Sequence, residues 1–393
     1  MTLSSTKLPP LRYQYLDFLR GFAALLVIYQ HTVDFAMMAR QDVILNATES
    51  GIAHFFTRQL GLGEAGVCIF LMVSGFVVPF SLASYPVKPV TTFVIHRFFR
   101  LYPAYWLSAV LGLIFVWWRF GSEHGGNEIS WLMFFANLTM FQAFIGIENI
   151  IGSYWTLTLE LLFYITCIYL FKRKKLTSLK SILMFFVGLL ILREVLRHVP
   201  TISAYYWNVF SYLRYTGYMF FGLLFREWLF KGDKAAAKNA IIILALTFVS
   251  FAGKDILRIW SLQAEYLKTP MTQFAAIAIF VLVTSIFKTG GKTGDFLGKI
   301  SYSMYLFHPV IFYPLYTYCW ITLPPEIQAH PHLFFLLSAI LTIIFSYFSY
   351  RWIENPAIAW GKHITQRRNG SREQSQQLLF AQTEHGKTAT QIG

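Results

Sequence analysis

The chain of 393 residues is 56% hydrophobic and only 13% charged, whereas a soluble domain carries about 25% charged residues. This composition excludes an ordinary soluble enzyme and predicts an all-α polytopic membrane protein. A formal net charge of +14 would suit nucleic acid, but the cations stand in short clusters between apolar runs. Because that distribution is typical of the cytoplasmic loops of membrane proteins, we expect no nucleic-acid partner.

Ten apolar segments are long enough to cross a membrane. They lie at 16–39, 65–85, 101–118, 153–171, 181–197, 207–228, 239–253, 270–287, 300–321 and 333–353. With the N-terminus inside, 23 lysines and arginines fall on the inner side and 9 on the outer side, leaving out Arg20 within the first span. Since cytoplasmic loops carry the excess of cations, both termini are predicted to be cytoplasmic.

A weaker eleventh segment lies at 131–147. If it crossed fully, the lysine cluster at 172–175 would lie outside, against the charge bias. We therefore predict a re-entrant or interfacial piece. Its backbone N–H and C=O groups must then be hydrogen-bonded by protein or by a water-filled cavity. From about Lys362 the chain becomes polar, so we expect a membrane-embedded domain at 1–361 and a disordered cytoplasmic tail at 362–393.

The first span contains an arginine and a histidine, Arg20 and His31, and ionisable residues cost about 2.5–3.5 kcal/mol each at mid-membrane. Eleven residues separate them, which on a helix is a rise of about 16 Å with both side chains on one face. Asp34 either orients the imidazole, as carboxylates do in hydrolytic triads, or faces the outer water. Arg20 either serves a ligand or pairs structurally with Asp17.

An inner loop at 94–106 carries Arg97 and Arg100 three residues apart. On one face of a helix the two guanidinium groups would suit phosphates. The alternative is a positive-inside anchor with an aromatic belt that includes Tyr105.

Two later spans hold polar side chains that need partners. Glu160 stands in the otherwise uncharged span at 153–171, four residues before Tyr164, and it is either a buried ion-pair partner or part of the site. Tyr305 and His308 lie one turn apart in the span at 300–321. They either pack between helices, with His308 hydrogen-bonded across, or take part in catalysis.

Taken together, these segments resemble the acyltransferase-3 family of integral membrane acyltransferases from Tyr15 to about Pro356. The matching residues, in chain order, are Asp17, Arg20, Gly21 and His31; Gly66, Val67, Phe70, Ser74, Gly75 and Phe76; Arg97, Arg100, Pro103, Tyr105 and Trp106; Trp155, Thr156, Leu157, Glu160, Phe163 and Tyr164; Ile300, Ser301, Tyr302, Tyr305, Leu306 and His308; and Glu354 with Pro356. His96 and Leu161 depart from the pattern, since many members have an arginine and a second acidic residue there.

The resemblance implies transfer of an acyl group, most often acetyl, from cytoplasmic acetyl-CoA to a hydroxyl of an extracytoplasmic polysaccharide or lipid-linked sugar. It implies a multi-pass protein of a bacterial inner membrane, among membrane lipids, with no metal. The implied roles are catalysis for His31, Arg20 and Glu160, donor binding for Arg97, Arg100, Arg20 and Tyr105, and substrate binding for Asp34, Tyr164, Tyr305 and His308. His31 would be a general base or an acyl carrier. Assembly into a homo-oligomer is compatible with this interpretation. The alternative function is a transporter or exporter of a polar or glycan substrate.

Overall fold

The computed structural model describes residues 13–38, 47–120, 131–199, 213–256, 264–287 and 291–368. All regular elements in these ranges are helical, which confirms the all-α fold. The long helices are α1 (Gln14–Met38), α3 (Leu62–Ala83), α4 (Pro89–Phe120), α6 (Trp155–Lys172), α7 (Leu179–Arg197), α9 (Thr216–Lys231), α10 (Lys234–Ile256), α11 (Ala264–Leu282), α12 (Gly291–Tyr318) and α14 (Pro331–Ser349). The short ones are α2 (Ala47–His54), η1 (Phe55–Gln59), α5 (Trp131–Leu138), η2 (Gln142–Ile145), η3 (Gly152–Tyr154), η4 (Leu213–Tyr215), η6 (Val283–Phe287), η7 (Trp320–Thr322), α13 (Pro325–Gln328) and η8 (Tyr350–Glu354).

Each long helix overlaps one of the predicted spans. Within the described ranges, seven stretches are long and apolar enough to cross a membrane, and they cover all or most of α1, α3, α4, α6, α10, α11 and α14. The chain is therefore a multi-pass membrane protein. The helix α9, with 16 residues, is shorter than the usual span of about 20. The count of ten spans stays a prediction.

The segment at 131–147 folds back against α4. Its helix α5 has 8 residues, too few to cross a hydrocarbon core about 30 Å thick. The Asn137 amide closes the segment, donating to the carbonyl oxygens of Met133 and Glu148 at 2.9 Å each. The Trp106 indole donates to the Leu138 carbonyl at 2.9 Å. These bonds satisfy backbone groups that a re-entrant or interfacial piece would otherwise leave unpaired.

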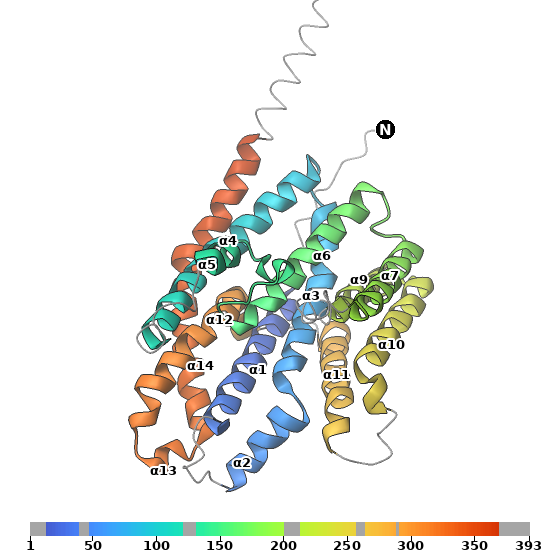
Figure 1. The fold of residues 1–393 in the computed structure, drawn as a ribbon. Helices are drawn as coiled ribbons and strands as arrows, with labels where there is room; N and C mark the ends of the chain where they lie inside the picture. The colour runs from blue at the N-terminus through green and yellow to red at the C-terminus, as the bar shows by residue number, and fades with distance from the viewer. Residues whose placement is uncertain are drawn as a thin grey trace, which may run out of the picture.

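The helix α1 is central and packs against α12, α3 and α14 (Figure 1). Glycines allow the closest approaches, as in many membrane bundles. A Cβ atom at Gly298 of α12 would lie 2.4 Å from the Asp17 carbonyl oxygen of α1. A Cβ atom at Gly75 of α3 would lie 1.8 Å from the Met219 carbonyl oxygen of α9. Any larger residue at these two positions would force the helices apart.

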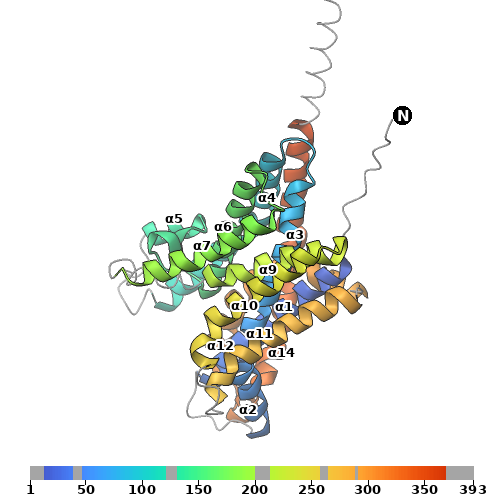
Figure 2. The same ribbon diagram turned by 90° about the vertical axis from the view of Figure 1, so that its right-hand side faces the viewer.

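The two ends of the bundle differ in charge. The start of α4, the end of α6 and the end of the C-terminal helix lie at one end, whereas α2 and α13 lie at the other (Figures 1 and 2). The first end carries Lys88 and the cluster at 172–175, and we call it the cationic end; the opposite one is the α2 end. Because α1 runs toward α2, His31 lies nearer the α2 end than Arg20 does.

The last helix is longer than expected. It runs without a break from Pro331 to Arg368, a stretch of 38 residues that includes the π-helical turn η8. The predicted domain boundary at 361 falls inside it. A hydrogen bond links this helix to α4, with the His96 Nε2 atom 2.9 Å from the Thr365 hydroxyl. The predicted tail beyond 368 and the N-terminus before 13 lie outside the described residues.

Candidate active site

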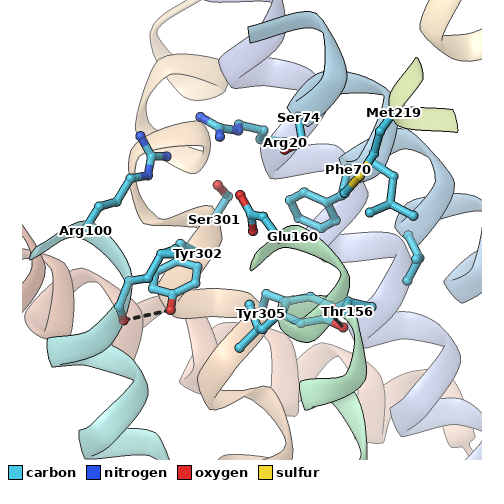
Figure 3. Close-up of a pocket in the computed structure, with 14 residues that line it drawn as sticks. Arg20, Phe70, Ser74, Arg100, Thr156, Glu160, Met219, Ser301, Tyr302 and Tyr305 are labelled. Carbon is cyan, nitrogen blue, oxygen red and sulfur yellow. Dashed lines mark hydrogen bonds between the residues drawn. The ribbon is translucent and has the colours of Figure 1, made fainter. Parts of the chain in front are cut away.

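A pocket with an empty volume of about 640 Å³ lies among α1, α3, α4, α6, α9 and α12 (Figure 3). We call it the arginine cavity. Four of the predicted site residues line it: Arg20, Arg100, Glu160 and Tyr305. The remaining lining residues are Val67, Phe70, Leu71, Ser74, Leu101, Thr156, Leu157, Met219, Ser301 and Tyr302. Segments up to 285 positions apart in the chain thus meet in one site.

Two cations face one carboxylate in the arginine cavity. The guanidinium groups of Arg20 and Arg100 lie close together on one side of it, and the Glu160 carboxylate lies below them in the view of Figure 3. In the described part of the chain neither guanidinium forms a hydrogen bond or an ion pair, although the charges of Arg100 and Glu160 both act on Arg20. The N–H donors of both guanidinium groups are therefore available to a ligand, and the site suits an anionic or strongly polar group.

Glu160 is held from behind by a buried tyrosine. The Tyr164 hydroxyl donates to Glu160 Oε1 and accepts from Arg97 Nη1 at 3.5 Å. The Arg97 side chain is buried and lies over two rings, with its Cζ 5.2 Å from the centroid of Phe93 and 5.1 Å from that of Tyr164. This orients the carboxylate toward the cavity.

Two of the expected donor contacts lie outside the cavity. Arg97 and Arg100 do not form the pair of exposed guanidinium groups that their spacing suggested, because the aromatic rings draw Arg97 behind Tyr164. Tyr105 is buried, and its hydroxyl donates to the Asn137 carbonyl oxygen. It supports the segment at 131–147 instead of facing the cavity.

A buried carboxylate that the sequence analysis did not assign to the site lies close by. Glu354 of η8 is 2% exposed, and its Oε2 accepts from the Ser303 hydroxyl at 3.1 Å. The charges of Arg100 and Arg20 both act on it. The signal was present, since Glu354 interrupts an apolar run just as Glu160 does.

Two imidazoles adjoin the cavity. The rings of His31 and His308 are 5.1 Å apart between centroids and nearly perpendicular at 78°. His31 is exposed and His308 fully buried. The His308 ring also lies 5.8 Å from that of Tyr305, whose hydroxyl accepts from Thr156 at 2.7 Å and donates to the Ser153 carbonyl at 2.9 Å. Tyr305 thus lies between the arginine cavity and the imidazole pair.

Asp34 does not orient His31. Its carboxylate accepts from the Gln30 amide and pairs with Arg58 Nε at 3.2 Å. Three residues after His31, it is turned about 60° around the helix, and Arg58 of η1 holds it there. In the described part of the chain, His31 itself has no hydrogen bond. In this structure the Asp34 carboxylate therefore pairs with Arg58 and does not hydrogen-bond to His31, and its role in substrate binding stays a prediction.

A second, larger pocket follows the imidazole pair. It has an empty volume of about 1470 Å³ and no charged lining residue. Two of its lining residues follow the imidazole pair in sequence: Phe35 lies one turn after His31, and Pro309 lies directly after His308. We call it the aromatic cavity; its other lining residues are Gly112, Phe115, Val116, Ile150, Ile151, Gly152, Val310, Tyr313, Tyr316, Thr317 and Ile321.

Residues 13–351 match the family model described as an acyltransferase domain. The chain belongs to the acyltransferase-3 family. No curated protein and no solved structure matches it. The family match spans the arginine cavity and the imidazole pair, and it ends three residues before Glu354. Together with the apolar helices, it supports a membrane acyltransferase over the exporter that the sequence analysis kept as its alternative.

Proposed function

We propose that this acyltransferase moves acetyl from cytoplasmic acetyl-CoA to a hydroxyl of an extracytoplasmic polysaccharide or lipid-linked sugar, in a bacterial inner membrane. One observation carries the proposal. A cavity with two guanidinium groups that have no hydrogen-bond partner in the described part of the chain adjoins a pair of imidazoles along α1, and Arg20 lies nearer the cationic end than His31 does.

The donor side is proposed for the arginine cavity. Acyl-CoA carries phosphates and a polar thioester, and Arg20 and Arg100 have no hydrogen-bond partner in the described chain. Guanidinium groups bind phosphate and carbonyl oxygens through paired N–H donors. The positive-inside pattern supports entry from the cytoplasm, and the buried surroundings would protect the thioester from water.

The acceptor side is proposed for the region of His31 and the aromatic cavity. As a general base, His31 would take the proton of the acceptor hydroxyl while its oxygen attacks the thioester carbonyl. The proton would then pass to the leaving thiolate, giving the free thiol. As a carrier, an imidazole nitrogen would attack the thioester carbonyl and break its C–S bond, so that CoA leaves as the thiol with the proton that the ring loses; the acceptor hydroxyl would then cleave the acyl-imidazole, form the ester and return its proton to the ring. Both roles need a neutral His31 with one free lone pair.

The test is consumption of labelled acetyl-CoA by the purified protein in detergent, with and without an acceptor glycan. We expect release of free CoA and label on the glycan, both lost in His31→Gln. An enzyme that consumes no acetyl-CoA with any glycan tried, while remaining folded, would overturn the proposed donor. A fully active His31→Gln would overturn the proposed role of His31 and leave the donor intact.

A further inference from the structure

The inference concerns His308 and rests on the proposed function. His308 is fully buried on α12, and its ring adjoins that of His31 on α1. In the described part of the chain its Nε2 atom has no hydrogen-bond partner. Buried polar atoms without partners are uncommon in proteins, and each needs an explanation, such as a bound water molecule or a catalytic role.

The tautomer of His308 is fixed by its backbone. Its Nδ1 atom lies 2.8 Å from the carbonyl oxygen of Tyr305. Because a carbonyl oxygen can only accept, Nδ1 must carry the hydrogen. A neutral ring then keeps its lone pair on Nε2, so His308 presents a buried acceptor that no described group uses.

His31 has the complementary need. A neutral imidazole carries one N–H and one lone pair, and a catalytic base works best when a neighbour fixes which nitrogen has which. The nearby carboxylate of Asp34 is occupied by Arg58 and Gln30. Among the described residues, His308 Nε2 is a buried acceptor without a hydrogen-bond partner, on a ring that adjoins the ring of His31.

We propose that His308 is the positioning residue of this enzyme. Its Nε2 atom accepts from one ring N–H of His31, directly or through one water molecule, and so leaves the other His31 nitrogen with its lone pair for the substrate. No proton is transferred to His308. When His31 takes the hydroxyl proton it carries two N–H groups, one of which stays hydrogen-bonded to His308 until the proton passes to the leaving thiolate.

The kinetic test uses three substitutions in the full-length enzyme. His308→Phe fills the space without an acceptor, and we expect kcat to fall by about 100-fold, the lower end of what a well-placed base supplies. The KM for acetyl-CoA should change by less than about twofold, since the donor cavity is untouched. His308→Gln retains an acceptor oxygen and should keep more of kcat than His308→Phe does.

The third substitution tests whether the enzyme needs the basic nitrogen of His308 or only the volume of its ring. His308→Gly leaves a space the size of the lost ring, and imidazole added to the solution should restore part of kcat. Pyrrole has nearly the same shape but no basic nitrogen, so it should not. The control is His198→Gln, an exposed histidine at the end of α7, a helix that lines neither cavity, which should leave kcat unchanged.

A measurement on the unaltered protein keeps the proposal testable even if the variants misfold. With ¹⁵N-labelled histidine, nitrogen chemical shifts report the tautomer of His31, which the proposal expects to be single and fixed. A mixture of both tautomers would overturn it. So would a folded His308→Phe enzyme with unchanged kcat, or equal restoration by pyrrole and imidazole. Failure of the enzyme to use acetyl-CoA would instead count against the proposed function, because the nitrogen shifts do not depend on turnover.

Discussion

The guanidinium of Arg97 lies over the ring of Tyr164, with its Cζ atom 5.1 Å from the ring centroid. The Tyr164 hydroxyl in turn donates to Glu160, so a carboxylate in the cavity is held by a cation outside it. In Tyr164→Phe both Arg97 and Glu160 lose a partner in a buried setting. We expect the free energy of unfolding to fall by about 1–3 kcal/mol.

Thermal unfolding in detergent measures this effect. Tyr169→Phe on the same helix is the matched control, because Tyr169 is exposed and its hydroxyl should contribute little. Equal melting temperatures for the two variants would contradict the role of Tyr164.

Arg100 should bind donor and Arg97 should not. In Arg100→Ala we expect the KM for acetyl-CoA to rise about tenfold or more, because a hydrogen bond to a charged group is worth about 1.5–3 kcal/mol. Arg351→Ala removes an exposed arginine outside the cavity and should leave KM unchanged. Steady-state kinetics against acetyl-CoA decide the matter, and equal effects from the two variants would remove Arg100 from the donor site.

His31→Gln separates catalysis from folding. Because the His31 side chain is exposed and has no hydrogen bond in the described chain, its replacement should leave the melting temperature nearly unchanged. Activity should fall by at least about 100-fold, the contribution of a general base. A large loss of stability in this variant would show that the residue is structural.

Glycine positions give two predictions of opposite sign. Gly75→Ala would place its Cβ atom 1.8 Å from the Met219 carbonyl oxygen, and overpacking of this kind costs about 1–3 kcal/mol. At Gly188 of α7 nothing lies within 4 Å of an added Cβ atom. Gly188→Ala should therefore stabilise the helix by about 0.5–1 kcal/mol. Melting temperatures that shift in the same direction would contradict the close contact of α3 and α9.

The α2 end should show a dependence on pH. Glu49 of α2 accepts from His330 Nδ1 at 2.8 Å and lies 3.3 Å from His332 Nδ1. Burial raises the pKa of its carboxyl, but these two hydrogen bonds outweigh burial and hold the pKa below its usual value of about 4.5. A carboxyl whose pKa is lower in the folded state stabilises that state above its unfolded pKa and loses the effect as pH falls through the folded one.

We therefore expect Glu49→Gln to lower the melting temperature near pH 5, with the difference from the unaltered protein shrinking toward about pH 3. Melting curves at several pH values measure it. A difference that stays constant over this range would mean that the charge of Glu49 does not contribute.

The helices were predictable because long apolar runs leave few other conformations in a membrane. Arg20, Arg100, Glu160 and Tyr305 were predicted to share a site, and the structure brings them together in one cavity. Their polarity in apolar surroundings was the signal, and it does not depend on the details of packing.

Side-chain direction was not predictable in the same way. Arg97 and Arg100 have the same local pattern, and the Tyr164 ring that holds Arg97 lies 67 positions further along the chain. The partner of Asp34 comes from a different helix, so spacing along α1 could not reveal it. Glu354 was overlooked for a similar reason, because its nearness to Arg100 is created by folding alone.

The C-terminal helix has a consequence for the shape of the molecule in its membrane. Its 38 residues correspond to a rod of about 57 Å, whereas the hydrocarbon layer is about 30 Å thick. Nearly half of the rod must stand in headgroups or water, and the portion with Lys362, Arg367 and Arg368 is the one suited to do so. A soluble molecule that approaches from that side meets a positively charged helix end projecting from the membrane before it reaches the bilayer.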